Sequence, residues 1–311
     1  MNTQPRIAVL IPCHNEEVAI SAVVHDFRAA LPEATVFVFD NNSRDRTVEV
    51  ARDAGAVVRR VPLQGKGNVV RRMFADVEAD AYILVDGDDT YHAAGARDMV
   101  ARLFAGNLDM VVGRRVTAET AAYRPGHRFG NWVLTEFVAR LFGRAFTDIL
   151  SGYRVFSRRF VKSFPALASG FEIETELTVH ALELRMPIEE IDTPYKSRPE
   201  GSVSKLNTYR DGIRILWTIL KLFRQERPLA FFGGIGAGLS LASLALSIPL
   251  FLTYAETGLV PRFPTAILAT GMMVTAFLSL ACGLILDTVT RGRHEMKRLV
   301  YLQSAPPQAG L

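Results

Sequence analysis

The chain has 311 residues, of which 49% are hydrophobic and 22% are charged, and its formal net charge is +4. This length allows one large domain or two smaller ones, and the apolar share is high for a protein that lies wholly in water. Residues 205–228 carry six Lys or Arg against two acids, and residues 291–298 carry four against one, so the basic charge favours anionic lipid headgroups over nucleic acid as a partner.

The first half of the chain alternates short β-rich runs with helical patterns. Strands are predicted at residues 6–12, 35–40, 57–61, 81–86 and 109–113, and amphipathic helices lie between them. Further along, residues 131–146 and 171–184 predict helices, and residues 186–195 predict an edge strand interrupted by proline. Repeated strand and helix units predict an α/β fold, Rossmann-like, with a mostly parallel sheet and helices on both faces.

The C-terminal third predicts membrane association. Residues 206–228 form an amphipathic pattern typical of an interfacial helix. Residues 229–254 and 264–286 contain no charged residue, and each is longer than the roughly 20 residues that cross a bilayer. We therefore predict a catalytic domain at 1–205, a juxtamembrane helix at 206–228, a two-helix transmembrane hairpin at 229–290 and a basic tail at 291–311.

The flanking charges predict the orientation of this hairpin. Lys221, Arg224 and Arg227 precede the first span, and further basic residues follow the second, which places both flanks in the cytoplasm. The N-terminus lacks the apolar core of a signal peptide. We expect an integral protein of the cytoplasmic (inner) membrane whose catalytic domain faces the cytoplasm. Small residues in the first span, Gly233, Gly234, Gly236 and Gly238, predict packing against a second copy.

Three polar clusters follow predicted strands. "PCHNEE" follows the first strand, "DNNSRDRT" the second and "DGDDTY" the fourth. In open parallel sheets, ligands bind beyond the carboxyl ends of the strands, so these clusters are expected at one rim. The close carboxylates Asp86, Asp88 and Asp89 indicate either an acidic turn or a site for a hard divalent cation, Mg²⁺ or Mn²⁺, which would also grip a diphosphate.

Seven motifs together carry a family resemblance: "IPCHNEE", "FDNNSRDRT", "GKGN", "VDGDDTY", "SGYRVFSRRF", "GFEIETEL" and "RPEGSVSKL". Their order over residues 6–215 resembles family 2 glycosyltransferases of the GT-A fold, specifically the polyprenyl-phosphate glycosyltransferase branch that includes dolichol-phosphate mannose synthase. The C-terminal hairpin resembles bacterial members of that branch. The resemblance implies inverting, metal-dependent transfer of a sugar from a nucleotide-sugar to polyprenyl (undecaprenyl or dolichyl) phosphate on the cytoplasmic membrane face. We expect the nucleotide to be UDP rather than GDP.

The resemblance also implies roles for individual residues. Asp86 and Asp88 look like the Asp-x-Asp pair, with Asp88 as the main metal ligand. Thr90, which stands where the family often has a glutamine, is a further candidate metal ligand. The residues that resemble donor-binding positions are Pro12, Asn15, Glu16, Asp40, Asn42, Lys66, Asp86, Arg198, Ser202 and Lys205. The residues that resemble lipid-phosphate positions are Arg114 or Arg115, Arg128, Asn131 and Ser151, with Arg128 also catalytic.

Two alternatives stay open from the sequence. A phosphate acceptor is already ionised and needs no strong base, whereas a lipid or polysaccharide hydroxyl acceptor would need one. Asp148, Glu172 and Glu174 are the candidates for that base. The other alternative is a membrane-anchored protein that binds nucleotide-sugars without turnover.

Overall fold

The computed structural model describes residues 4–116, 136–139, 146–199, 217–218 and 220–307. The chain divides into two compact units, Met1–Ile215 with Lys297–Leu311, and Leu216–Met296. Of the predicted helix at 131–146, residues 136–139 are described and are helical. Of the predicted interfacial helix at 206–228, residues 217–218 and 220–226 are described and are helical.

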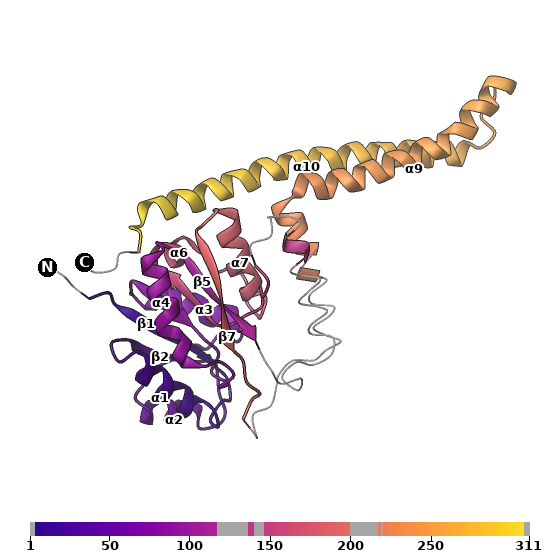
Figure 1. Cartoon of the computed structure of the whole chain (residues 1–311). Helices are drawn as coiled ribbons and strands as arrows, with labels where there is room; N and C mark the ends of the chain where they lie inside the picture. Colours follow the sequence, from indigo (N-terminus) through magenta and orange to yellow (C-terminus); the bar gives the residue numbers. More distant parts are fainter. Residues whose placement is uncertain (1–3, 117–135, 140–145, 200–216, 219, 308–311) are drawn as a thin grey trace. The chain divides into compact units, whose positions relative to one another are not determined.

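The first unit is built on a seven-stranded sheet with the order β3-β2-β1-β4-β6-β5-β7 (Figure 1). The strands are β1 Ile7–Cys13, β2 Thr35–Asp40, β3 Val57–Arg60, β4 Ala81–Leu84, β5 Met110–Val116, β6 Arg154–Ser157 and β7 Ile188–Pro194. The helices are α1 Ile20–Ala30, α2 Thr47–Asp53, α3 Lys66–Asp76, η1 Ala93–Gly95, α4 Ala96–Ala105, α6 Arg158–Ser163 and α7 Ile173–Glu183.

The sheet is mostly parallel, as the alternating pattern predicts, with one exception. β6 runs antiparallel to both β4 and β5, and the sequence did not indicate it, because four residues are too few for periodicity to separate a strand from a loop. The edge-strand prediction is confirmed: β7 pairs with β5 on one side and ends the sheet, with Pro194 as its last residue.

Helices cover both faces of the sheet. On one face, alternate residues of the strands, among them Val9, Ile11 and Ile83, pack against α1 and α4 in one core cluster. On the other face, Phe74 of α3 meets the rings of Tyr82 and Phe156 edge-on, at 6.2 and 5.8 Å. Because both faces are buried, β1 and β4 are nearly continuous apolar runs.

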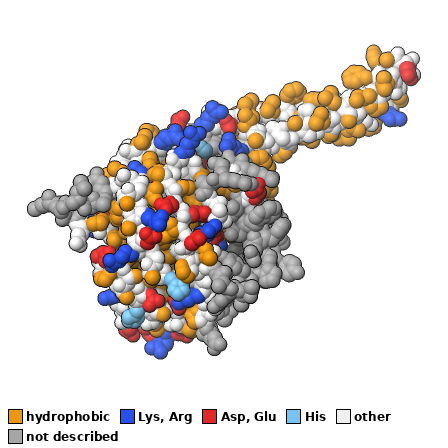
Figure 2. All heavy atoms as spheres, viewed as in Figure 1, with side chains coloured by type: hydrophobic (Ala, Val, Ile, Leu, Met, Phe, Trp, Pro, Cys, Tyr) orange, Lys and Arg blue, Asp and Glu red, His pale blue; other side chains and the backbone are white. Residues whose placement is uncertain are grey.

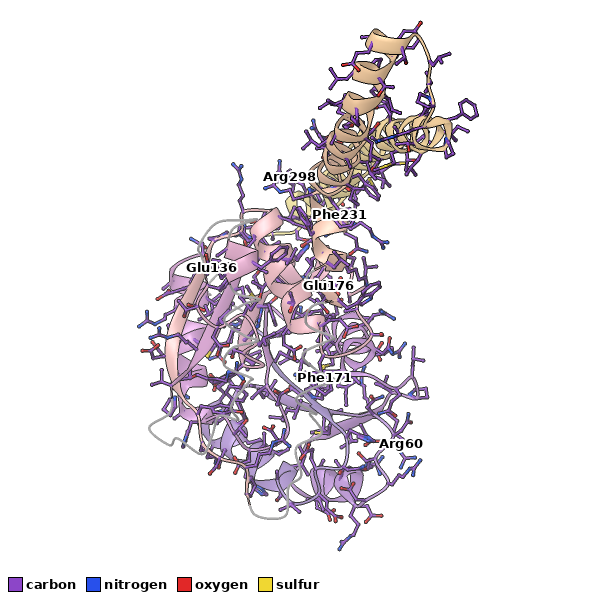
Figure 3. All side chains as sticks on the ribbon, turned by 90° about the vertical axis from the view of Figure 1, so that its right-hand side faces the viewer. Arg60, Glu136, Phe171, Glu176, Phe231 and Arg298 are labelled. Atoms are coloured by element: carbon purple, nitrogen blue, oxygen red, sulfur yellow. The ribbon has the colours of Figure 1, made fainter. Side chains whose placement is uncertain are left out.

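The loop before α7 lies directly against the start of α3. A side chain at Gly67 would place its Cβ only 2.2 Å from the carbonyl oxygen of Ala168, so this approach requires glycine. Glu176 of α7 holds the same loop by accepting hydrogen bonds from the backbone N–H groups of Leu167 and Ala168, at 2.9 and 2.7 Å (Figure 3). These contacts bring the first turns of α3 and α7 together.

The second unit contains helix α9, Pro228–Thr257, and most of helix α10, Phe263–Gln303. Both are long and apolar enough to cross a membrane, with a mean hydropathy of 2.0 in their most apolar stretches. Hydrophobic side chains cover their outer surface (Figure 2). Their mutual contact uses small residues: a Cβ at Gly236 would lie 2.9 Å from the carbonyl oxygen of Ala276, and Ser243 donates to the carbonyl of Ala269 at 2.7 Å.

The last turns of α10 belong to the first unit. The Tyr301 hydroxyl donates to Oδ2 of Asp109 at 2.8 Å, and the guanidinium of Arg159 lies over the Tyr301 ring at 4.9 Å. Asp109 is fully buried, and Lys297 pairs with Glu183 at 2.6 Å. The last turns of α10 are therefore held by specific polar contacts.

Candidate active site

The turns after β1, β2 and β4 form one polar rim, as predicted. Backbone N–H of Asn15 donates to Ser43 Oγ at 2.9 Å, and the Asn15 side chain accepts from the N–H of Arg44 at 2.8 Å. Asn15, Asn42 and Asp89 have positive φ angles of 53°, 61° and 57°. Non-glycine residues in this region are uncommon and cluster at functional sites, and here each strand-end turn contains one.

The predicted donor-binding residues of the first two turns lie together at this rim. Asp40, the last residue of β2, is 3% exposed and accepts from the N–H of Ser43 at 3.2 Å. Asn42 donates to the carbonyl of Pro62 at 2.7 Å. Pro12 pairs with Phe39 near the ends of β1 and β2. The carboxylate and amide groups predicted to contact a donor are thus gathered at one place, and those contacts stay a prediction.

Asp88 is the buried carboxylate of the acidic turn. Its residue exposure is 6%, and its Oδ1 accepts a hydrogen bond from the Thr90 hydroxyl at 2.6 Å. Burial, followed by the charge of Asp86, raises the pKa of Asp88 above its usual value, and Arg198 opposes the shift. Oxygen-only donors and crowded negative charge suit Mg²⁺ or Mn²⁺. In this arrangement the predicted ligand Thr90 orients Asp88.

Asp86 belongs to a different group of charges. Lys66, the first residue of α3, lies with Nζ 2.5 Å from Asp86 Oδ1 and 2.5 Å from Glu174 Oε1. Burial alone would lower the pKa of Lys66, but the two carboxylates outweigh it and raise the pKa. Burial raises the pKa of Glu174, against the influence of Lys66. The structure thus brings Lys66 to the rim, as predicted, and uses it to fix Asp86.

Two cations from the segment after β7 reach the acidic turn. Arg198 Nη2 lies 2.5 Å from Asp88 Oδ2, and its Nη1 lies 3.8 Å from Glu16 Oε1. Lys196 Nζ lies 2.8 Å from Asp89 Oδ1. Of these contacts, the sequence predicted only that Arg198 would come near the rim. The sequence analysis did not predict Lys196. The signal was present in "KSR", because side chains two residues apart in an extended segment lie on the same side.

The two arginines at the end of β5 face different partners. Arg114 forms a bidentate ion pair with Asp192 of β7, at 2.6 and 2.9 Å, and is 43% exposed. Arg115 forms a bidentate pair with Asp148 at 2.7 Å for both bonds, and its guanidinium lies 5.6 Å from the centre of the Tyr195 ring. Tyr195 in turn forms an antiparallel bridge with Tyr91, which follows the acidic turn, so Arg115 is the arginine on the rim side.

The segment around Ser151 lies beside Asp86, since a Cβ at Gly152 would be 2.3 Å from Asp86 Oδ2. Ser151 is fully buried and its hydroxyl donates to the carbonyl of Gly113 at 2.6 Å, so its predicted contact with a lipid phosphate is not made from this position. Arg154 is also fully buried and donates to the carbonyls of Ser151 and Ile149, at 2.9 and 2.6 Å. Burial lowers its pKa to about 10. Four predicted site residues lie outside the described residues: Arg128, Asn131, Ser202 and Lys205.

Comparison with known proteins assigns the chain to a family. The family model described as Glycosyl transferase family 2 matches residues 8–164. The chain belongs to glycosyl transferase family 2. The relative glycosyltransferase AglJ of Haloferax volcanii is 32% identical over 310 residues, which cover 97% of this chain and 100% of that relative. The protein is therefore an enzyme, a glycosyltransferase.

A second relative and a solved structure are also similar to this family 2 glycosyltransferase, and the solved structure supports the GT-A fold. The dolichyl-phosphate hexose transferase of Haloferax volcanii is 27% identical over 221 residues, which cover 71% of this chain and 95% of that relative. Glucosyl-3-phosphoglycerate synthase from Mycobacterium tuberculosis superposes with a TM-score of 0.58 at 23% identity, over 70% of this chain and 79% of that structure. The predicted GT-A fold is confirmed.

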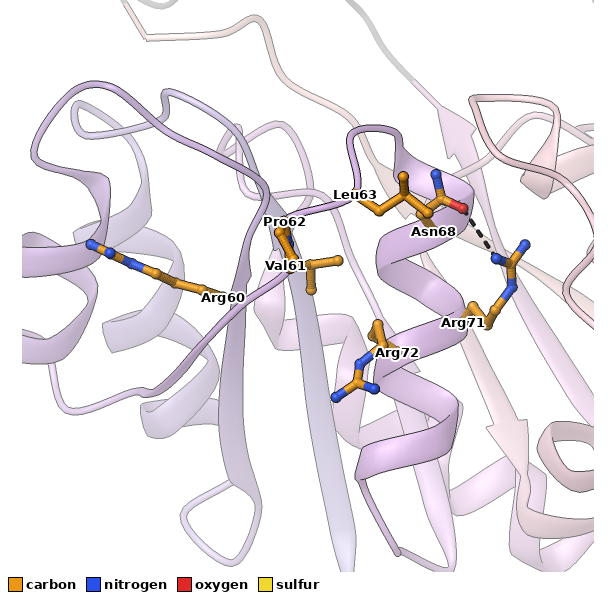
Figure 4. Close-up of a pocket in the computed structure, with 7 residues that line it drawn as sticks. All are labelled: Arg60, Val61, Pro62, Leu63, Asn68, Arg71 and Arg72. Carbon is orange, nitrogen blue, oxygen red and sulfur yellow. Dashed lines mark hydrogen bonds between the residues drawn. The ribbon is translucent and has the colours of Figure 1, made fainter.

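One further pocket lies between β3 and α3, with a volume of about 360 Å³ (Figure 4). It is lined by Arg60, Val61, Pro62, Leu63, Asn68, Arg71 and Arg72. Arg71 donates to the Asn68 side chain at 3.2 Å and to the carbonyl of Ala166 at 2.8 Å. None of the residues predicted for the donor lines it, so the candidate site of this glycosyltransferase is the rim and not this pocket.

Proposed function

We propose that the protein transfers a sugar from a nucleotide-sugar, UDP rather than GDP, to polyprenyl phosphate on the cytoplasmic face of the inner membrane. Two relations support the substrates. A relative is named dolichyl-phosphate hexose transferase, and a structural neighbour was crystallised with Mn²⁺, UDP-glucose and glycerol 3-phosphate. The two apolar helices α9 and α10 support an anchor in the bilayer, where such a lipid lies.

One observation favours a phosphate over a hydroxyl as the acceptor. The carboxylates Asp148 and Glu174, which could serve as a base for a hydroxyl, are each buried and ion-paired, with Arg115 and Lys66 respectively. The second oxygen of Glu174 is also enclosed, with an exposed area below 1 Å². An acceptor proton cannot reach these groups in this arrangement, whereas a phosphate monoester brings its own charged nucleophile.

The roles of the residues follow from this reaction. An oxygen of the lipid phosphate attacks the anomeric carbon, and the bond from that carbon to the diphosphate breaks with inversion. Asp88, with Asp86 and Thr90 beside it, would hold a Mg²⁺ or Mn²⁺ ion, which neutralises the charge that develops on the leaving diphosphate. Arg198, Ser202 and Lys205 would add hydrogen bonds and charge to the same group.

The acceptor side is assigned to the arginines. Arg115, with Arg128 and Asn131 as the remaining predicted partners, would bind the lipid phosphate, because guanidinium groups bond phosphate oxygens two at a time. Arg115 already lies beside Tyr195 and the rim. Its present partner Asp148 would then hold the guanidinium in the orientation that the phosphate needs.

The test is an assay of membranes containing the protein with labelled UDP- and GDP-sugars and one polyprenyl phosphate. We expect a metal-dependent, chloroform-soluble, acid-labile product, and loss of this product in Asp88→Asn. Glu172→Gln is the matched variant, because Glu172 is half-buried at the start of α7 and is the remaining candidate base. Retained activity in Glu172→Gln supports a phosphate acceptor. Loss of activity in Glu172→Gln, together with an acid-stable product from the wild-type protein, would refute it.

A further inference from the structure

The segment Tyr195–Arg198 is fixed across the acidic turn by its backbone. The N–H of Tyr195 donates to the carbonyl of Val116 at 2.9 Å, and the N–H of Lys196 donates to the carbonyl of Thr90 at 3.0 Å. Tyr195 also forms an antiparallel bridge with Tyr91, and their rings meet at 5.2 Å. The backbone therefore places the side chains of Lys196 and Arg198 at the carboxylates of this turn.

Both oxygens of Asp88 are occupied in this arrangement. Oδ1 accepts from the Thr90 hydroxyl at 2.6 Å, and Oδ2 lies 2.5 Å from Nη2 of Arg198. A divalent cation binds a carboxylate oxygen at about 2.0–2.2 Å, and a guanidinium at that oxygen leaves no room for it. Repulsion between the two positive charges acts in the same direction. The metal and Arg198 must therefore compete for Asp88.

The nucleotide donor offers a new partner to the Arg198 guanidinium once the metal has displaced it from Asp88. A diphosphate bound to the metal lies within a few ångströms of Asp88, and Arg198 can bond its oxygens bidentately. Lys196 pairs with Asp89, which is not the proposed metal ligand, so it can keep the segment in place while Arg198 changes partner. Metal binding and nucleotide binding would then be coupled through one side chain.

We propose that Arg198 holds the place of the divalent cation on Asp88, and that metal and donor together move Arg198 from Asp88 to the diphosphate. Lys196 acts as the positioning residue that keeps Arg198 within reach of both. This inference rests on the proposed function only in that a metal and a nucleoside diphosphate bind at this rim. It predicts that metal binds weakly alone and more tightly when nucleotide is present.

The test measures Mn²⁺ binding to the full chain in detergent, by the spin-resonance signal of free Mn²⁺, with and without UDP. For the wild-type chain, UDP should tighten Mn²⁺ binding by about tenfold or more, within the usual range of coupling between two ligands. Without UDP, Arg198→Gln should bind Mn²⁺ about tenfold more tightly than wild type, and UDP should then tighten it far less. Arg198→Lys keeps the charge and should stay close to wild type.

Arg72→Gln is the matched control, because Arg72 also pairs with a carboxylate, Asp76, at 2.7 Å, but on α3 away from the acidic turn. It should leave Mn²⁺ affinity within about twofold of wild type, as expected for a distant surface charge. Arg198→Gln with unchanged or weaker Mn²⁺ binding would overturn the inference while leaving the proposed function intact. If no variant binds Mn²⁺ with or without UDP, the inference and the metal part of the proposed function both fail.

Discussion

Replacing Lys66 by Met removes the cation that two carboxylates share and keeps an unbranched side chain of similar length. Lys66 Nζ lies 2.5 Å from both Asp86 and Glu174, and the Lys66 and Glu174 side chains are 10% and 6% exposed. Removing one partner of a buried ion pair costs about 3–5 kcal/mol, because the remaining charge is left without compensation in a poorly solvated place. Here two carboxylates would also repel each other.

The assay is thermal unfolding of the purified protein in detergent at one fixed heating rate. For a domain of this size, a loss of about 3–5 kcal/mol corresponds to a fall of about 6–20 °C in the unfolding midpoint. The double variant Lys66→Met with Glu174→Gln removes the buried charge together with its partner, and should recover at least half of that fall. Arg72→Met breaks an ion pair whose arginine is 58% exposed, and should cost about 0–1 kcal/mol.

A midpoint for Lys66→Met within a few degrees of the Arg72→Met variant would refute the reasoning. Failure of Glu174→Gln to restore stability in the Lys66→Met background would also refute it, since the destabilisation would then not come from unpaired carboxylates. Either result would mean that water reaches Asp86 and Glu174 well enough to solvate their charges.

Three further predictions follow from single contacts. A Cβ at residue 152 would lie 2.3 Å from Asp86 Oδ2, so Gly152→Ala should lower sugar transfer at least about tenfold with little change in the thermal unfolding midpoint. Unchanged turnover would count against a role of Asp86. Burial and the charge of Lys297, opposed by Glu183, lower the pKa of His180 to about 3, so between pH 6 and 4 the unfolded chain binds a proton that the folded chain does not. Stability should therefore decrease by about 1.4 kcal/mol for each unit that the pH falls in this range, and His180→Phe should remove that part of the slope in unfolding experiments. Tyr301→Phe leaves Asp109 Oδ2, fully buried, without its donor, and should cost about 1–3 kcal/mol in the same unfolding assay, whereas Tyr254→Phe, 55% exposed, should cost close to nothing.

Local pattern in the sequence determined the frame of the molecule. Alternating strand and helix signals predict a parallel sheet, and parallel strands place their carboxyl ends at one edge, so the gathering of Asn15, Asp40 and Asp88 follows without coordinates. The two uncharged stretches are apolar on all sides, which length and composition alone reveal. These inferences succeed because each depends on residues that are close together in the chain.

Only the tertiary structure decided which charges meet. Lys66 begins α3, Asp86 follows β4 and Glu174 lies in α7, and no periodicity relates the three positions. The close approach of Gly67 to the loop before α7 brings the first turns of the two helices together. The same holds for Arg198 on Asp88, and for the antiparallel β6, whose four residues give too weak a local signal. Ion pairs form between segments that folding makes neighbours, and sequence spacing does not encode that distance.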